Sequence, residues 1–463
     1  MSYILNDVIG LRSWWRVPYA YYIKGVCSAQ KLTKEEFELL SRCDGHSEIE
    51  ESELLTDLLE RGMVLECEPG ERSLSSWQKM ECDNRYFPAM NWMITGKCNY
   101  NCLHCFNAAD NSPLMAEFSP EEAERLLDEA MACGINAFTI TGGEPMCHKD
   151  FLPIMEGIYR RGMYVEELNT NGFYITQEVL DRMKEIGCDP LMKISFDGVG
   201  HHDWLRNRKG AEEDALRAIS LCIQNGFRVK AQTNVHRKNV DSMLATARLL
   251  DEMGVHEMRI IRTTEAPRWN ANSEGSTLGL DEYFDRMLEF SRAYTAEEHN
   301  MVIDVWQFIV LRPHSKSYSL RPVSCRAGDF RLSRPVCRGN RAMIAVSANG
   351  NVFPCMQMSG YYESKNDVLG NVKETGLRPI LQVGRYLAEV CTTVGDLAAA
   401  NAECNACPYF KYCTGGCRAI ALTLTSDKLG VDPSKCLFFR KGYYDKVVET
   451  LGDWRNNTPI VME

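Results

Sequence analysis

Three closely spaced cysteines are the first residues in the chain whose types and spacing point to chemistry. Cys98, Cys102 and Cys105 lie in the segment GKCNYNCLHCF, directly after the apolar run NWMIT. Cysteine thiolates are ligands for zinc and for iron–sulfur clusters, yet both kinds of centre ordinarily take four protein ligands. The segment therefore predicts a metal centre and leaves open what occupies its fourth position.

A larger set of cysteines with ligand-like spacing lies in the last third of the chain. The motif CNACPYFKYCTGGC and the upstream segment CRGNRAMIAVSANGNVFPC contribute Cys404, Cys407, Cys413, Cys417, Cys337 and Cys355. A zinc ribbon would account for the first motif alone, but with Cys325 and Cys436 the set has more ligands than one zinc ion binds. Cys391, in AEVCTTV, is interpreted as a core thiol on a helix.

The overall composition limits the classes of protein. A chain of 463 residues is long enough for two or three domains. Its net charge of −11, without a run rich in lysine and arginine, argues against nucleic acid or an anionic membrane as a partner. Because there is no signal-like start and no run of ~18 apolar residues, we expect a cytoplasmic protein. In that compartment, 20 cysteines indicate metal or redox chemistry and some core thiols, not a disulfide scaffold.

Between the two cysteine groups, short β-rich runs alternate with helical patterns. One helix is expected to begin at Ser119, where Pro120 suits the first turn and Glu122 closes a capping box, and to end at Gly134. This alternation predicts a parallel sheet, curved or closed as in part of a (β/α) barrel, with the chemistry at the carboxyl ends of its strands. The six expected strands are 91–95, 137–141, 164–168, 191–195, 228–234 and 257–262.

Polar motifs follow these strands. In GGEP, Gly142 and Gly143 allow close approach of backbone to a ligand and Glu144 can accept from an ammonium group, whereas a simple turn is the alternative. Arg206 can pair bidentately with a carboxylate, unless it is exposed to solvent. The NTNG motif, with Asn169 and Asn171, either contacts a ribose or forms a common turn. The KISFDG motif places Ser195 at the end of the next strand.

With these motifs in this order, residues 91–265 resemble the core of a radical S-adenosylmethionine (SAM) enzyme. The resemblance implies a partial (β/α)6 barrel over residues 86–265, in which the three cysteines hold a [4Fe–4S] cluster whose open iron binds SAM. The cluster, reduced by an external donor such as flavodoxin or ferredoxin, would cleave SAM to a 5'-deoxyadenosyl radical that abstracts hydrogen from the substrate. His104 would pack near the adenine. The implied SAM contacts are Gly142, Gly143, Glu144, Asn169, Asn171, Ser195 and Arg206.

The C-terminal cysteines resemble a second family, the SPASM domain, over roughly residues 325–440 of an expected domain 325–463. SPASM domains hold two auxiliary clusters, so the implied total is three [4Fe–4S] clusters. Cys325, chosen for its proximity, or an open iron would complete the inner auxiliary cluster. By analogy the outer cluster is bound by Cys404, Cys407, Cys413 and Cys436, and the inner one by Cys337, Cys355 and Cys417.

Residues 1–85 are expected to form a small winged helix, with a strand pair around YAYYIKG, the helices LTKEEFELL and SELLTDLLERG, and the strand MVLEC. Ten basic residues against sixteen acidic ones disfavour DNA as its ligand. The segment resembles the leader-binding domain of enzymes that modify ribosomally made peptides, the RiPP recognition element, in which a leader peptide adds a strand to a sheet edge. Residues 266–324 would bridge the barrel and the tail through a helix at 280–294, with Arg268 in a substrate channel or a linker.

Together these features predict an enzyme that modifies a ribosomally made precursor peptide. Hydrogen abstraction and oxidative closure would form a thioether or a carbon–carbon crosslink, with no residue identified as catalytic acid or base. Peptide epimerisation and cofactor biosynthesis are alternatives, while sulfatase-maturase-like chemistry is disfavoured because PCMQM lacks the aspartate those enzymes carry after the cysteine at position 355. A non-catalytic iron–sulfur electron carrier or sensor is a further alternative, although it needs neither an open iron nor a carboxylate at a strand end.

Overall fold

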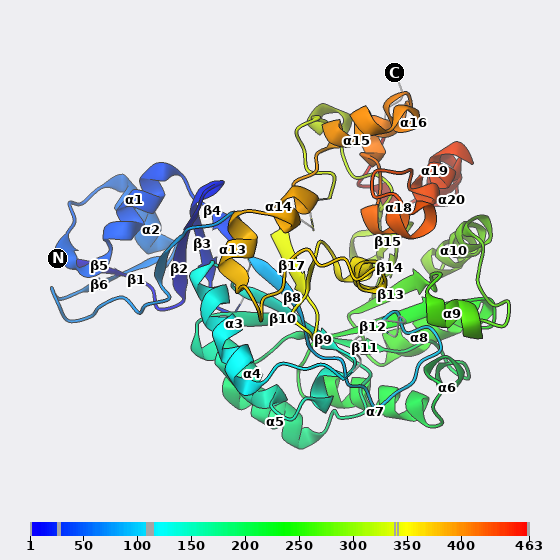
Figure 1. Ribbon diagram of the computed structural model, residues 1–463, viewed down its shortest axis with the longest axis horizontal. Helices are drawn as coiled ribbons and strands as arrows, with labels where there is room; N and C mark the ends of the chain where they lie inside the picture. Colours follow the sequence, from blue (N-terminus) through cyan, green and yellow to red (C-terminus); the bar gives the residue numbers. More distant parts are fainter. Residues whose placement is uncertain (1, 26–28, 108–114, 338, 340–341, 461–463) are drawn as a thin grey trace.

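The computed structural model describes residues 2–25, 29–107, 115–337, 339 and 342–460. Figure 1 shows a small N-terminal part (blue) at one side, a central sheet covered by helices (cyan and green), and a group of short helices (orange and red). The expected mixed α/β architecture is confirmed. No helix among the described residues is long and apolar enough to span a bilayer.

The N-terminal part consists of two small sheets and two helices. Helix α1 (Lys34–Arg42) begins at a capping box of Thr33 and Glu36, and α2 (Glu53–Glu60) begins at the cap Ser52. The expected helices and the expected strands at YAYYIKG and MVLEC are confirmed. One sheet has the order β5–β1–β6 and the other β4–β3–β2–β7. The strands are β1 (Ser2–Leu5), β2 (Ile9–Trp14), β3 (Val17–Ile23), β4 (Gln30–Lys31), β5 (Asp44–Glu48), β6 (Val64–Cys67) and β7 (Lys79–Cys82).

The six expected parallel strands are all present, in sequence order, in the central sheet. They are β8 (Ala89–Thr95), β9 (Ala137–Gly142), β10 (Tyr164–Thr170), β11 (Leu191–Ser195), β12 (Val229–Val235) and β13 (Glu257–Arg262). A helix follows each strand: α3 (Pro120–Ala132), α4 (Phe151–Arg160), α5 (Gln177–Ile186), α7 (Ala211–Gln224), α8 (Met243–Glu252) and α10 (Leu280–Thr295). The capping box of α3 forms as predicted, with Ser119 and Glu122 bonding each other's backbone.

The sheet continues on both sides of the six predicted strands. Beyond β13 come β14 (Val302–Val305), β15 (Ile309–Arg312), β16 (Ser317–Leu320) and β19 (Arg455–Asn456); beyond β8 come β17 (Met343–Val346) and β18 (Val352–Phe353). The region 266–324 therefore contains strands as well as the expected helix α10, so its description as a bridge was incomplete. Strands of four residues are too short for their apolar pattern to be distinguished from that of a loop.

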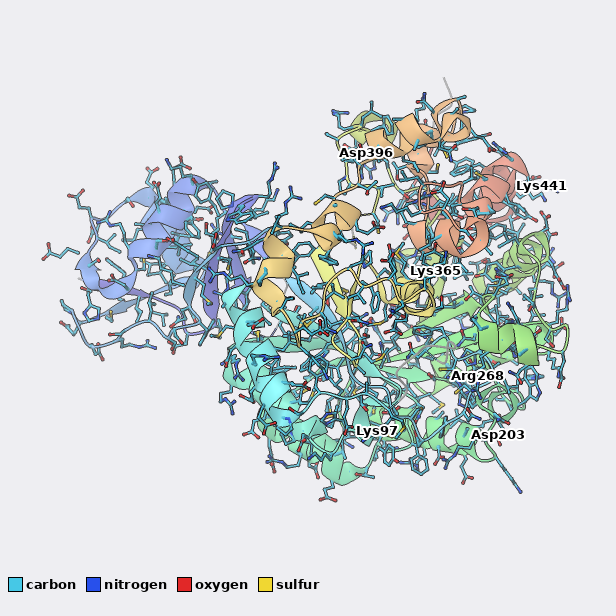
Figure 2. The ribbon with its side chains drawn as sticks, in the orientation of Figure 1. Lys97, Asp203, Arg268, Lys365, Asp396 and Lys441 are labelled. Carbon is cyan, nitrogen blue, oxygen red and sulfur yellow. The ribbon has the colours of Figure 1, made fainter. Side chains whose placement is uncertain are left out.

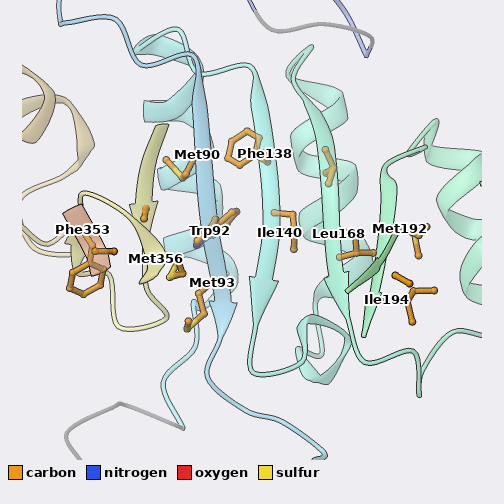
Figure 3. Close-up of a cluster of buried hydrophobic side chains, with 14 of the residues drawn as sticks. Met90, Trp92, Met93, Phe138, Ile140, Leu168, Met192, Ile194, Phe353 and Met356 are labelled. Carbon is orange, nitrogen blue, oxygen red and sulfur yellow. The ribbon is translucent and has the colours of Figure 1, made fainter. Parts of the chain in front are cut away.

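Burial alternates along β11 and β13, whereas β8 and β9 are buried at almost every position. Trp92, Ile140, Leu168 and Ile194 are fully buried, and Figure 3 shows them on neighbouring strands β8 to β11. Successive side chains of a strand point to opposite faces. Asn169, which follows Leu168, and Ser195, which follows Ile194, are therefore on the face opposite this core.

The N-terminal part is seated against the ends of α3 and α4. Trp14 is buried, and its Nε1 donates to the Cys133 carbonyl at 2.9 Å. A Cβ added at Gly134 would lie 2.5 Å from that nitrogen, so the glycine leaves room for the indole. Trp77 packs in the same way against Gly162, where an added Cβ would lie 2.7 Å from the ring. Removal of residues 1–85 would expose this contact surface, and point variants are therefore better tests of the N-terminal part.

Candidate active site

The loop that carries the three cysteines is held against the GGEP turn by backbone contacts. Gly143 N donates to Thr95 O and Glu144 N to Lys97 O, each at 2.8 Å. A Cβ at Gly143 would lie 2.3 Å from Lys97 O, and one at Gly142 would lie 2.6 Å from Thr95 O. The two glycines were expected to admit a ligand, but the neighbour that requires them is the backbone leading into the cysteine loop.

We predict that Gly143→Ala lowers the iron content of the three-cysteine site and lowers the melting temperature. Overpacking of a close contact costs about 1–3 kcal/mol, and here the contact is with backbone, which must move together with Cys98. Gly279→Ala is the matched control, because φ at Gly279 is −62° and the space around it is open. Equal iron content and equal melting temperatures for the two variants would refute this account of GGEP.

Two further contacts fix the cysteine loop from the opposite side. Leu103 N donates to Leu205 O of α6 (His202–Arg206) at 2.9 Å. Arg268, labelled in Figure 2, extends from α9 (Pro267–Asn272), and its Nε donates to the Cys102 carbonyl at 2.7 Å. The sequence analysis expected Arg268 to lie in a substrate channel or in a linker. In the structure, Arg268 instead holds the cysteine loop in position through its bond to the Cys102 carbonyl.

Glu144 is fully buried at the carboxyl ends of β9 and β10. Its carboxylate accepts from Thr170 Oγ1 at 2.8 Å and from Asn171 N at 2.8 Å. Burial raises its pKa to about 7, although the hydrogen bonds from Asn171 and Thr170 act in the opposite direction. A buried carboxylate without a cation is costly, so this position is suited to binding an ammonium group.

The two asparagines of the NTNG motif, Asn169 and Asn171, have different environments. Asn171 Nδ2 donates to Asn99 Oδ1 at 2.8 Å, and Asn171 Oδ1 accepts from Phe173 N at 3.0 Å. The Nδ2 end thus joins the segment after β10 to the cysteine loop, while the Oδ1 end holds the local turn. Asn169 Oδ1, in contrast, is buried and has no hydrogen-bond partner within the described ranges. Of the two asparagines, Asn169 is the better placed for a ligand.

Arg206 lies between an acid and a cysteine. Its Nε donates to Asp197 Oδ2 at 2.7 Å and its Nη1 to Cys102 Sγ at 3.9 Å. Burial opposes ionisation of Asp197, but Arg206 and His202 outweigh it and hold the pKa of that carboxyl well below its usual range. Arg206 therefore stays charged, and the alternative of solvent exposure is wrong because the residue is buried. Sequence analysis did not assign Asp197, although it lies in the SFDG motif.

His104 lies beside β12. Its Nε2 lies 3.1 Å from Asn234 Nδ2. Burial, with a further contribution from Arg206, lowers the pKa of the imidazole to about 3, so the ring is neutral. A neutral imidazole is suited to packing against the uncharged adenine of SAM, as the resemblance implies for His104.

Buried polar atoms around the cysteine loop allow a test of whether SAM fits. Five such atoms lack a hydrogen-bond partner in the part of the chain that the structure describes: Asn99 Nδ2, His104 Nδ1, Asn107 Oδ1, Asn169 Oδ1 and Arg206 Nη2. Buried polar groups are normally satisfied, and these comprise both donors and acceptors, on the cysteine loop itself and on residues at the ends of neighbouring strands. A ligand with amino, carboxylate and hydroxyl groups, as SAM has, fits them.

The three cysteines of the loop influence each other electrostatically. Burial raises the pKa of Cys98 to about 12, and Cys102 and Cys105 add to this. Within the described residues, no three His, Cys, Asp or Glu side chains are arranged to hold a single metal ion. A four-iron cluster presents separate irons to its thiolates, which then lie farther apart than the ligands of one ion. Three neighbouring thiols on one loop therefore suit the irons of such a cluster.

The C-terminal cysteines fall into the two predicted groups. Burial raises the pKa of Cys355 to about 12, with contributions from Cys417 and Cys337. It likewise raises the pKa of Cys436 to about 12, with contributions from Cys413 and Cys404, and Cys407 acts on Cys404. Such mutual effects require proximity. Cys325 is buried, its Sγ accepts from Arg334, and its backbone N donates to Tyr412 O at 3.1 Å.

Comparison with family models identifies both expected domains. The model described as "Radical SAM superfamily" matches residues 92–250, and the SPASM model, described as "Iron-sulfur cluster-binding domain", matches residues 337–408. The chain thus contains a radical SAM domain and a SPASM domain. These domains imply SAM and [4Fe–4S] clusters as cofactors.

Relatives carry several names. An "AdoMet-dependent heme synthase" of Methanosarcina barkeri is 27% identical over 344 residues, which cover 74% of this chain and 94% of the relative. A "PqqA peptide cyclase" of Granulibacter bethesdensis is 24% identical over 366 residues, which cover 78% of this chain and 90% of the relative. Streptococcus suis SuiB, solved with its precursor peptide SuiA, has a similar fold, with a TM-score of 0.63, 13% identity, and 94% of this chain and 99% of SuiB covered. With relatives named as synthases and cyclases, the protein is an enzyme.

Proposed function

We propose that this radical SAM enzyme modifies a ribosomally made precursor peptide, forming a thioether or a carbon–carbon crosslink. The observation that carries the proposal is the N-terminal part, which is docked on the barrel through Trp14 and has an exposed strand at the edge of its sheet. Because the SuiB overlay covers 94% of the chain, it includes most of residues 1–85. The peptide cyclase relative also favours a peptide as the substrate.

The residues around the cysteine loop have separate parts in the proposed reaction. SAM on a [4Fe–4S] cluster would supply the radical that takes a hydrogen atom from the substrate, and an auxiliary cluster would accept the electron released on ring closure. Glu144 would accept from the amino group of SAM, and Arg206 would donate from Nη2 to its carboxylate. Asn169 and Ser195 would contact the ribose. Asn171 and Arg268 would hold the loop in position.

Tetrapyrrole chemistry is a second candidate, favoured by a specific observation. The heme synthase relative shares more identity with this chain than the peptide cyclase does, and it is aligned over almost its whole length. That alignment covers 74% of this chain, against 94% for the overlay with SuiB. A tetrapyrrole enzyme does not need a leader-binding strand edge, so the function of the N-terminal part distinguishes the two candidates.

Strand β4 is the edge to which we assign the leader peptide. Both of its residues, Gln30 and Lys31, are exposed. Leu32 N donates to Tyr19 O at 3.1 Å, and the pairing with β3 is antiparallel. Backbone groups alternate in direction along such a strand, so the N–H and C=O of Lys31 point away from β3. An added peptide strand would bond to these groups.

We predict that Lys31→Pro weakens binding of the precursor peptide about tenfold, while Lys31→Ala has little effect. Proline removes the outward N–H, and one net hydrogen bond contributes about 0.5–1.5 kcal/mol. Any short open reading frame that adjoins the gene supplies the peptide, which is labelled and titrated by fluorescence anisotropy, a measurement that needs neither SAM nor iron. Iron coproporphyrin III, the tetrapyrrole in the name of another relative, an "Fe-coproporphyrin III synthase", is titrated in parallel. Tight binding of the porphyrin, with no binding of the peptide by any form of the enzyme, would favour the tetrapyrrole candidate.

A further inference from the structure

Charged side chains gather on the face of the central sheet that lies opposite its hydrophobic core. Met192 on β11 and Met258 on β13 are fully buried in that core, so the residues next to them in each strand point to the other face. This polar face also carries Asn169 and Ser195, the proposed ribose contacts. Its charged residues are Glu167 on β10, Lys193 on β11, Lys230 on β12, Glu257 and Arg259 on β13, and Asp304 on β14.

The two lysines of the polar face are paired with its two glutamates. Lys230 Nζ lies 2.9 Å from Glu257 Oε1 and 3.6 Å from Glu167 Oε1. Lys193 Nζ lies 3.6 Å from Glu167 Oε2. Each lysine therefore has a carboxylate partner, and the charges of these four side chains balance.

Arg259 differs from the two lysines, because the carboxylate beside it is already occupied. Asp304 accepts from Arg321 Nε at 2.9 Å and from Arg321 Nη2 at 2.6 Å, so both of its oxygens are bonded to that arginine. Arg259 Nε lies 3.9 Å from Asp304 Oδ2, which is too far for a hydrogen bond. This Nε is buried, and it has no hydrogen-bond partner among the residues that the structure describes.

An aromatic ring holds the guanidinium of Arg259 in place. Its Cζ lies 4.3 Å from the ring centroid of Trp306, the residue that follows β14. Trp306 is itself fixed beside β13, because its backbone N donates to Ile260 O at 2.8 Å. The Arg259 side chain is 18% exposed, so part of it is accessible to a solute. A fixed guanidinium with an unfilled N–H suits a planar anion such as a carboxylate.

The charged residues of the polar face leave one positive charge in excess. The lysines match the glutamates and Arg321 matches the aspartate, so the charge of Arg259 remains. Burial lowers the pKa of Lys193 to about 8; Arg259 and Lys230 act in the same direction, and Glu167 opposes them. An anion bound beside Arg259 would reduce this repulsion between cations.

We propose that Arg259 binds a carboxylate group of the substrate. The place is next to the SAM contacts, because Lys193 pairs in register with Asn169 and lies two residues before Ser195. The carboxylate of SAM itself is assigned to Arg206, so a second carboxylate belongs to the substrate. This inference rests on the proposed function for the presence of a substrate at this face. An acidic side chain or the carboxyl terminus of a peptide supplies such a group, as do the propionates of a tetrapyrrole.

The experiment titrates the reconstituted full-length enzyme with glutarate, a small dicarboxylate, by calorimetry at low ionic strength. SAM is present and dithionite is absent, so that Arg206 is occupied and no turnover occurs. Arg312→Gln is the control, because Arg312 lies on β15 of the same sheet and its Nη1 donates to Ser319 Oγ at 2.9 Å. We expect the dissociation constant to rise about tenfold or more in Arg259→Gln, since a hydrogen bond to a charged group is lost, and to stay unchanged in the control.

Two results of this titration would overturn the proposal. One is an equal dissociation constant for the wild type and Arg259→Gln, and the other is equal binding of glutarate and its uncharged diamide, glutaramide, by the wild type. Should Arg259→Gln fail to fold, Arg259→Lys keeps the charge but loses the planar fork, and it must still bind glutarate more weakly than the wild type. A merely structural arginine would change the melting temperature of the variants and leave glutarate binding unchanged.

Two further pairs of ligands identify the source of the carboxylate. The first compares the peptide product of a short adjoining open reading frame with a form in which every carboxyl group is an amide, and the second compares iron coproporphyrin III with its tetramethyl ester. The wild type should prefer the free acid of the true substrate about tenfold, and Arg259→Gln should bind both forms alike. An equal preference in Arg259→Gln would overturn the proposal. Glutarate binding that depends on Arg259, with no binding of peptide or porphyrin, would support the carboxylate site and be a failure of the proposed function alone.

Discussion

Replacement of Cys98, Cys102 and Cys105 together by alanine is expected to abolish formation of 5'-deoxyadenosine from SAM while most of the iron remains bound. The three thiols form a group of their own on the loop after β8, and the auxiliary groups lie in a different part of the chain. Iron should therefore fall from about twelve to about eight per chain, the values for three and two four-iron clusters. Iron is measured chemically and deoxyadenosine by mass spectrometry after incubation with dithionite.

The matched control replaces three cysteines that lie outside all the ligand groups: Cys67, Cys188 and Cys222. This variant should keep about twelve irons and should still cleave SAM. Deoxyadenosine production by the variant without Cys98, Cys102 and Cys105 would show that SAM is not cleaved at this loop. Loss of all iron from that variant would mean that the auxiliary clusters do not form without the cluster at Cys98, Cys102 and Cys105.

Glu144→Gln is expected to weaken SAM binding strongly and to remove its dependence on pH. The ionised carboxylate would pair with the amino group of SAM, and loss of a hydrogen bond to a charged group costs about 1.5–3 kcal/mol, roughly 10- to 150-fold in affinity. Burial raises the pKa of Glu144 to about 7, so the ligand-free carboxyl is protonated below that pH. Wild-type affinity should therefore rise with pH up to about 7 and level off above it.

Equilibrium dialysis of SAM against the reconstituted enzyme, at several pH values on either side of 7, measures this effect. Glu363→Gln is the control, because burial also raises the pKa of Glu363 to about 7, but this residue lies on α12 (Ser359–Ser364) near Ser347. The control should bind SAM like the wild type at every pH. An unchanged pH profile in Glu144→Gln would assign the amino-group contact to another residue.

Much of the fold could be predicted because its signals are local. The six parallel strands are β-rich runs bounded by helical patterns, and α3 carries its capping box and its terminal glycine in the sequence. The cysteine groups could be predicted because ligand spacing within a short loop determines which thiols can meet. For these features, residues close in sequence are the ones that interact.

The rest of the site depends on contacts between distant segments. Arg268 reaches the Cys102 carbonyl across 166 positions of the chain, and Asn171 reaches Asn99 across 72. No periodicity in the sequence indicates such pairs. Gly143 could be predicted only in part. The glycine in the sequence indicates that another group lies close to its backbone, but not whether that group is a ligand or, as in the structure, the backbone of Lys97. The burial of Trp14 could not be predicted either, because it depends on the space that Gly134, 120 positions away, leaves for the indole.

The most direct test of the account incubates the reconstituted full-length enzyme with SAM, dithionite and the peptide product of any short open reading frame that adjoins its gene. Deoxyadenosine and peptide mass are measured in the same samples, with iron coproporphyrin III replacing the peptide in parallel reactions. The account predicts that deoxyadenosine forms and that the peptide loses two hydrogen atoms, as closure of one crosslink requires. An unchanged peptide, together with conversion of the porphyrin, would contradict it and establish tetrapyrrole chemistry.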